Sequence, residues 1–187
     1  MGITQMIREE IKLNLGARTT SIPGFKNVDC DPHPGVHYVG DVSKLHKFAD
    51  KSVSEIFASN ILEHFPHVQT VAVLKEWHRV LKPKGKLWVS VPDFERTVKI
   101  YKEHGLKDWI QNIVSGDQNH KTAYHYAIFD FDRLHKVFML AGFRELSRID
   151  FEHWLSMFPD VNNCSNNIHE SDLLPVSINA LAIKGEK

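Results

Sequence analysis

Short runs of apolar residues, several of them alternating with polar ones, recur along this chain and end at glycine, proline or aspartate. Ile11, Leu13 and Leu15 form such an alternation, which stops at Gly16, and the run 25–28 stops at Asp29. Runs of this kind, bounded by turn-forming residues, are typical of β-strands. Later runs have the same character: 36–39, 53–58, 87–91, 143–149 and 177–183. The pattern therefore predicts seven strands.

Helical spacing occurs between the later strands. Apolar residues at 73, 74, 77, 80 and 81 share one face of a helix that ends in the sequence KPKG, 82–85. A helix is expected after the capping residue Asp93, and another after Asp130 that stops at Gly142. The buried stripe of the helix after Asp93 is predicted at Phe94, Val98 and Tyr101. Alternating strands and helices predict an α/β fold.

Two segments beyond the fifth strand have a different character. A short helix is expected at 109–114, and the polar stretch 115–126 is expected to be a surface loop. The stretch Pro159 to Asp172 is rich in asparagine and serine and is too long for an idle connection. Both follow the fifth strand, so we expect both to stand over the carboxyl ends of the strands.

The connections between the first three strands are unusually short. Twelve residues separate Leu15 from Val28, and six separate Asp29 from Val36. Parallel strands usually need a crossover of about a dozen residues or more, commonly a helix. We therefore expect little helix cover on one face and partly exposed apolar side chains there. A homodimer through that face is predicted, with residues 1–10 as the alternative cover.

The composition of the chain limits the number of domains and the classes of binding partner to be expected. The chain has 187 residues, 42% of them hydrophobic, which predicts a single domain over 1–187. Basic and acidic residues both number 23, so neither nucleic acid nor a membrane surface is an expected partner. Cys30 and Cys164 have no metal-ligand spacing, and HExxH is absent, so no metal site is expected. The absence of a long apolar run predicts a cytoplasmic protein.

Gly16 and Asp29 are the first candidates for a ligand site. In an open parallel sheet, ligands bind outside the carboxyl ends of the strands, where these two residues would lie side by side. Glycine allows close approach of the backbone, and a carboxylate accepts hydrogen bonds from ribose hydroxyls. A nucleoside-like ligand is therefore the first hypothesis. A dinucleotide oxidoreductase fits less well, because GxGxxG is missing and Asp29 follows Gly16 by only 13 residues.

Four sequence blocks in order carry a family resemblance: LNLGARTTSIPGFKNVDCD, GDVSKLHKFADKSVSEIFASNILEHF, LKEWHRVLKPKGKLWVSVPDF and HYAIFDFDRLHKVFMLAGFREL. Together they resemble a class I S-adenosylmethionine-dependent methyltransferase. More narrowly, they are similar to the small group of type 11 methyltransferase domains whose first strand runs almost directly into the second. The resemblance implies a doubly wound, mostly parallel seven-stranded Rossmann-like sheet with reduced helix cover on one face, and S-adenosyl-L-methionine as cofactor.

The resemblance also implies roles for individual residues. The cofactor-binding positions are Asn14, Gly16, Ala17, Arg18, Asp29, Asp41, Val42, Ser59 and Asn60. Among them, Asp29 takes the ribose hydroxyls, Asp41 and the backbone of Val42 meet the adenine, and Ser59 with Asn60 line the sulfonium. Arg18 stands where the family has a second glycine. Its side chain would either crowd the cofactor or pair with the cofactor's carboxylate.

An oxygen nucleophile benefits from a base, and histidine is suited to that task at neutral pH. His125 is the first candidate and His64, in the family's LEH sequence, the second. Polar groups of the 115–126 loop are expected to bind the acceptor: Asn119, His120, Tyr124 and Tyr126. They suit a hydroxylated small molecule or glycan better than an apolar acceptor. The alternative is a non-catalytic methyltransferase-like binding or assembly subunit with a degenerate cofactor site.

Overall fold

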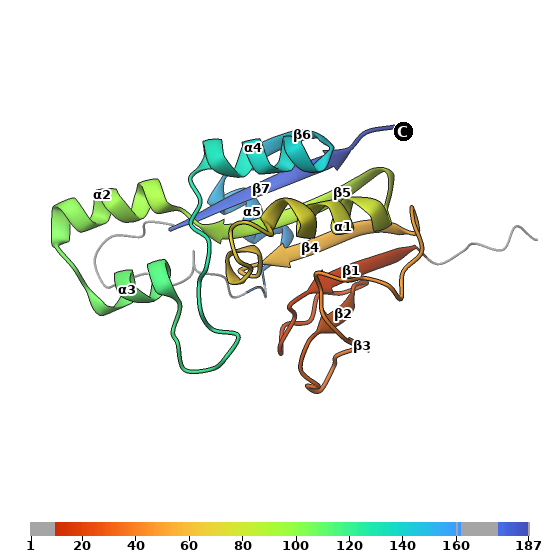
Figure 1. Cartoon of the computed structure of the whole chain (residues 1–187), viewed down its shortest axis with the longest axis horizontal. Coiled ribbons are helices and arrows are strands. Elements are labelled where there is room, and N and C mark those ends of the chain that lie inside the picture. Colours follow the sequence, from red (N-terminus) through yellow and green to blue (C-terminus); the bar gives the residue numbers. More distant parts are fainter. Residues whose placement is uncertain (1–9, 160, 162–175, 187) are drawn as a thin grey trace, which may run out of the picture.

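One seven-stranded sheet organises the protein (Figure 1). The computed structural model describes residues 10–159, 161 and 176–186. The strand order is β3-β2-β1-β4-β5-β7-β6. The strands are β1 Ile11–Leu15, β2 Lys26–Asp29, β3 Tyr38–Val39, β4 Val53–Ser59, β5 Leu81–Pro92, β6 Phe143–Ile149 and β7 Ser177–Lys184. The first five run parallel, whereas β7 is antiparallel to β5 and β6 is antiparallel to β7.

Helices cover both faces of the sheet, as expected for a doubly wound fold. The helices are α1 Thr70–Val80, α2 Phe94–His104, α3 Asp108–Ser115, α4 Phe131–Ala141 and α5 Phe151–Met157, with a short 3₁₀ turn η1 at Leu62–His64. Figure 1 shows α1 and α4 together on one face, α5 on the other, and α2 with α3 beyond the carboxyl end of β5. The predicted fold class is confirmed. None of the described helices has the length and apolar character that crossing a membrane requires.

Hydrogen bonds join α1 to the loop after β3 and to β7. Trp77 is completely buried, and its Nε1 donates to the carbonyl oxygen of Val42 at 2.8 Å. Lys184, on β7, is 3% exposed and donates from Nζ to the carbonyl oxygens of His78 and Leu81, each at 2.7 Å. A cation at this end of α1 is favourable, because the last carbonyls of a helix carry partial negative charge.

On the sheet face where the crossover helices are missing, β1 and β2 carry two polar side chains. Apolar side chains of the first three strands are also partly exposed, as expected, at Ile11 (36%) and Val39 (45%). The register places Leu13, Leu15 and Val28 toward the core and sends Asn14 and Asn27 to the opposite face. There, Asn14 Nδ2 donates to Asn27 Oδ1 at 3.1 Å. Both amides also donate to the carbonyl oxygen of Thr20 at 3.1 Å. Because side chains alternate along a strand, polar residues occupy the part of this face, on β1 and β2, that α5 does not cover.

Most local expectations are confirmed, with four corrections. Asp93 and Asp130 cap α2 and α4 by accepting from backbone N–H groups, and Gly142 ends α4 with φ 100°. However, the third strand is only Tyr38–Val39, β5 starts at Leu81 rather than Leu87, and α5 was not predicted. The buried residues of α2 are Thr97 and Ile100, not the stripe predicted at Phe94, Val98 and Tyr101.

Candidate functional site

The turn after β1 depends on a glycine. Gly16 has φ 66°, a left-handed conformation that side-chain-bearing residues rarely adopt. Its N–H donates to the carbonyl oxygen of Val28 at 2.9 Å, which ties the end of β1 to β2. A Cβ atom here would lie 2.7 Å from Cδ1 of Ile61, after β4. The close packing of Ile61 on the turn thus excludes any larger residue at position 16.

Asp29 ends β2 and binds the same turn. Its Oδ2 accepts from the backbone N–H of Arg18 at 2.7 Å, and its Oδ1 accepts from the N–H of Asp31 at 3.0 Å. Arg18 has φ 43°, so it adopts the conformation for which the family's glycine is suited. Asp29 is only 4% exposed. A carboxylate offers about four acceptor positions, so two remain for ribose hydroxyls. The acceptor positions of the Asp29 carboxylate therefore fit the ribose of the cofactor.

The predicted adenine position lies after β3. Gly40 N–H donates to the carbonyl oxygen of Asp29 at 2.7 Å, which brings the end of β3 beside the end of β2. The Asp41 carboxylate is exposed and accepts from the N–H and the hydroxyl of Ser43, at 2.8 and 2.6 Å. Val42 is buried. Gly16, Asp29 and Asp41 therefore gather at one edge, the carboxyl ends of the first three strands.

Ser59 belongs to a polar row that crosses the sheet. The register aligns Ser59 of β4 with Ser90 of β5, and Ser90 with Asn179 of β7. Ser59 Oγ, Ser90 Oγ and Asn179 Oδ1 are buried, and none has a hydrogen-bond partner in the described part of the chain. Sequence reasoning missed Ser90 and Asn179. The available signal was a polar residue inside each of two apolar strands, LWVSVP and SINALAI.

The two candidate catalytic histidines come together beyond the end of β4. Their rings are 4.8 Å apart in a T-shaped arrangement. His64 Nδ1 hydrogen bonds with the carbonyl oxygen of Tyr124 at 2.9 Å, and His125 Nδ1 with that of Ile113 at 2.8 Å. Burial and, as the second cause, the nearby His125 lower the pKa of His64 to about 4. Hydrogen bonds with the backbone of Tyr124 and Asn60 oppose this shift. Burial also lowers the pKa of His125. Both rings are thus neutral at pH 7.

Glu63 lies beside the two histidines and is completely buried. Burial raises the pKa of its carboxyl group to about 8, so the group is protonated at neutral pH. Its carbonyl oxygen accepts from the N–H groups of Tyr126 and Ala127, at 2.8 and 3.1 Å. This contact fixes the 115–126 loop against η1. These backbone contacts give Glu63 a structural role.

The predicted acceptor residues are all exposed on the 115–126 loop. The rings of Tyr124 and Tyr126 stack, with centroids 6.2 Å apart and an interplanar angle of 28°. His120 Nδ1 hydrogen bonds with Thr122 Oγ1 at 2.9 Å. Asn119 shares the exposed part of the loop. The stretch 159–172 was expected beside this loop over the carboxyl ends of the strands, but only Pro159 and Val161 of it lie within the described residues.

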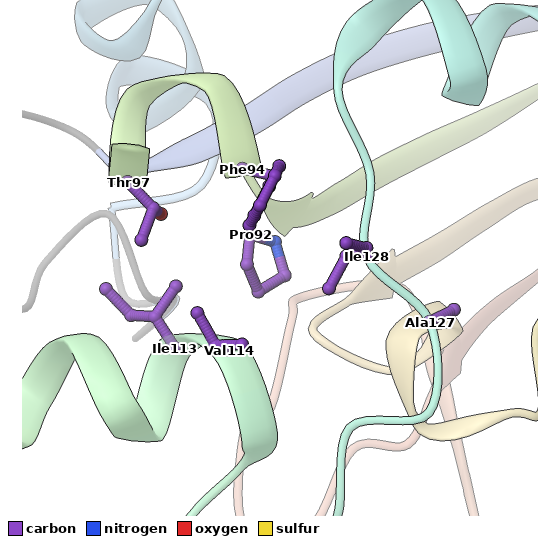
Figure 2. Close-up of a pocket in the computed structure, with 7 residues that line it drawn as sticks. All are labelled: Pro92, Phe94, Thr97, Ile113, Val114, Ala127 and Ile128. Atoms are coloured by element: carbon purple, nitrogen blue, oxygen red, sulfur yellow. The ribbon is translucent and has the colours of Figure 1, made fainter. Parts of the chain in front are cut away.

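An apolar pocket lies between α2, α3 and the segment that leads into α4 (Figure 2). Its lining residues are Pro92, Phe94, Thr97, Ile113, Val114, Ala127 and Ile128. The enclosed space is only about 10 Å³, roughly the room that one water molecule needs. Ligand pockets usually span about 300–1,000 Å³. This pocket is therefore too small to enclose a ligand.

Comparison with known proteins fits this geometry. Residues 23–89 match the family described as methyltransferase domain, type 11. The match includes Asp29, Asp41, Ser59 and His64, whereas His125 lies beyond it. The resemblance to class I S-adenosylmethionine-dependent methyltransferases, noted from the sequence, is confirmed. No curated protein matches the chain in sequence.

Solved methyltransferase structures share the fold. A SAM-dependent methyltransferase from Archaeoglobus fulgidus has a TM-score of 0.60 at 14% identity, over 94% of this chain and 86% of the other. A SAM-dependent methyltransferase from Methanosarcina mazei has a TM-score of 0.60 at 14% identity, over 97% and 95%. The 1,6-didemethyltoxoflavin-N1-methyltransferase of Burkholderia thailandensis, solved with its substrate and S-adenosylhomocysteine, has a TM-score of 0.56 at 15% identity, over 95% and 72%. At these identities the similarity shows the fold alone.

Proposed function

We propose that this methyltransferase-domain protein transfers a methyl group from S-adenosylmethionine to an oxygen of a hydroxylated acceptor, a small molecule or a glycan. The observation that supports this most is the pair His64 and His125, half-buried and neutral beside the end of β4. The cofactor supplies a methyl group on a sulfonium, so the protein's main tasks are to align the acceptor and to exclude water.

His125 is the proposed base. Its Nδ1 faces the carbonyl oxygen of Ile113, so Nδ1 carries the proton and Nε2 keeps a lone pair. Nε2 would accept the acceptor's hydroxyl proton as the new O–C bond forms and the C–S bond breaks. His64 packs against the His125 ring and limits its movement. The stacked Tyr124 and Tyr126 offer flat faces and hydroxyl groups, which suit a polyhydroxylated ring.

The cofactor would lie over Gly16, Asp29 and Asp41, at the carboxyl ends of the first three strands. Asp29 has acceptor positions left for the ribose, and the Arg18 guanidinium is suited to pair with the methionine carboxylate. Loss of cofactor affinity in Arg18→Gly would support that pairing, whereas a gain would show that Arg18 crowds the site. The cytoplasmic location expected from the sequence is kept as part of the proposal.

Turnover of a His125→Ala variant tests the proposal, with S-adenosylhomocysteine release across a panel of hydroxylated acceptors as the readout. We expect a loss of about 100-fold or more in kcat with unchanged cofactor affinity, because general-base catalysis contributes about 10²- to 10⁴-fold. His135→Ala, an exposed change on α4, is the matched control. Unchanged turnover in His125→Ala would show that His125 is not the general base.

The second candidate is the non-catalytic binding or assembly subunit. Two observations favour it: Asp29 is almost completely buried by its own chain, and Ile61 packs directly on Gly16. Both would have to yield before a nucleoside reached the turn. Absence of S-adenosylmethionine binding at millimolar concentration would favour this candidate, and protein partners would then be sought.

A further inference from the structure

Three side chains of metal-ligating type meet beside the end of β4. One ligand atom each from Glu63, His64 and His125 lie within 4.8 Å of one another. Glu63 and His64 are neighbours in η1, and His125 comes from the loop between α3 and α4. The proposed methyl transfer assigns no task to the Glu63 side chain, so its presence in this cluster calls for a separate explanation.

Glu63 provides an independent indication of a ligand. Its side chain is completely buried, and neither Oε1 nor Oε2 finds a hydrogen-bond partner among the described residues. An unsatisfied buried carboxyl group is costly, and native proteins meet such groups with a protein partner, a water molecule or an ion. The neighbouring imidazoles make an ion the best match, because carboxylate and imidazole are preferred ligands of transition metals.

The two histidines are oriented as metal ligands usually are. A ligating imidazole commonly donates its second N–H to a backbone carbonyl or a carboxylate, which fixes the tautomer and the ring. His64 Nδ1 meets the carbonyl of Tyr124, and His125 Nδ1 meets that of Ile113. Nε2 of His125 is then left to coordinate. For His64, the contact with the backbone of Asn60 has to be replaced by the metal before Nε2 can coordinate.

We propose that Glu63, His64 and His125 bind one divalent transition-metal ion, for which zinc is the first probe. Two histidines and one glutamate are a common ligand set for zinc that keeps an open position. His125 is far from Glu63 and His64 in sequence, and the three residues lack a familiar motif spacing, so no metal site was expected from the sequence.

This inference rests on the proposed function in one respect, the use of the open position. There, the metal would hold the acceptor's hydroxyl oxygen and lower its pKa, so that its proton leaves to water. The oxygen then attacks the methyl carbon: the O–C bond forms, the C–S bond breaks, and sulfur keeps the electron pair. In this state His125 acts as a ligand instead of a base.

Zinc titration of the chelator-treated full chain tests the site without cofactor or acceptor. We expect one zinc ion per chain, measured by calorimetry and by elemental analysis after gel filtration. Glu63→Gln and His125→Ala should each weaken binding by more than about tenfold, since even the loss of a second-shell partner costs about 10- to 100-fold. His67→Ala is the matched control, because His67 is exposed and lies three residues from His64.

Cobalt provides a second readout, since its visible absorption reports on the geometry of the bound ion. Wild type and His67→Ala should give the same spectrum, which Glu63→Gln should lose while its circular dichroism is unchanged. Absence of zinc binding at micromolar concentration, or equal binding by all variants, would overturn the proposal. Because no methyl donor is present, failure of the proposed methyl transfer would leave the metal result intact.

Discussion

Glu63 gives the sharpest link between structure and stability. Its carboxyl pKa is raised from the ordinary value of 4.5 to about 8, because burial disfavours the charged form. Between these two values the folded protein retains a proton that the unfolded chain has released. The free energy of unfolding therefore falls as pH rises through this window, and the contribution levels off above about pH 8.

The expected magnitude follows from the pKa difference. At 1.36 kcal/mol per pKa unit, the window from 4.5 to about 8 corresponds to about 5 kcal/mol. His64 and His125 contribute in the opposite sense: their lowered pKa values reduce stability only below the ordinary histidine value of 6.5. The interval from pH 6.5 to 8 therefore isolates Glu63, and wild type should lose about 2 kcal/mol across it.

Urea unfolding at several pH values, with a chelator present, measures this slope. Glu63→Gln should show no such fall, because the amide does not titrate. Glu95→Gln, an exposed change on α2, should retain the wild-type slope. The slope is the readout rather than the absolute stability, since glutamine introduces buried polar hydrogens of its own. A flat wild-type curve, or an equal fall in Glu63→Gln, would show that Glu63 is ionised in the folded protein and would refute the reasoning.

Three further outcomes are expected. Arg18→Gly should raise the unfolding free energy by up to about 1 kcal/mol, because a left-handed residue with a side chain costs about 1–2 kcal/mol and glycine's added flexibility returns part of this; a decrease in urea unfolding would contradict it. Ser90→Ala should stabilise by about 1 kcal/mol, since it removes a buried hydroxyl without a described partner; destabilisation would reveal a hydrogen bond at Oγ. The homodimer remains a prediction, and the exposed Val39 on the edge strand β3 is the apolar residue that we expect at its contact. Light scattering should then give a dimer that Val39→Lys dissociates, and a monomer at high concentration would exclude it.

Features that depend on neighbouring residues were predicted correctly from the sequence. Asp93, Asp130 and Gly142 were predicted as helix boundaries, because capping depends on a few neighbouring residues. The absence of crossover helices between the first three strands was predicted from the short length of the two connections alone. The KPKG segment was harder: it signals a helix end, yet the chain passes from α1 directly into β5, and the irregular register between Val53 and Glu55 accommodates the extra residues.

Features that depend on packing between distant segments were beyond the sequence. The buried face of α2 was misassigned, because Thr97 and Ile100 become buried only through the way α2 meets α3 and the loop after it. On β1 and β2, apolar side chains were expected on the sheet face opposite the core. Asn14 and Asn27 lie there instead, because they alternate with the core residues. The meeting of Glu63 with His125 depends on how the 115–126 loop crosses the end of β4, which no local pattern encodes.

Calorimetric titration with S-adenosylmethionine and S-adenosylhomocysteine, alongside an Asp29→Ala variant, tests the central claim most directly. We expect micromolar binding of one ligand per chain and its loss in Asp29→Ala, because Asp29 shapes the turn and would supply the ribose acceptors. Circular dichroism of the variant separates loss of the site from loss of the fold. Absence of binding by the folded wild-type chain at millimolar ligand would contradict the account and favour the non-catalytic subunit.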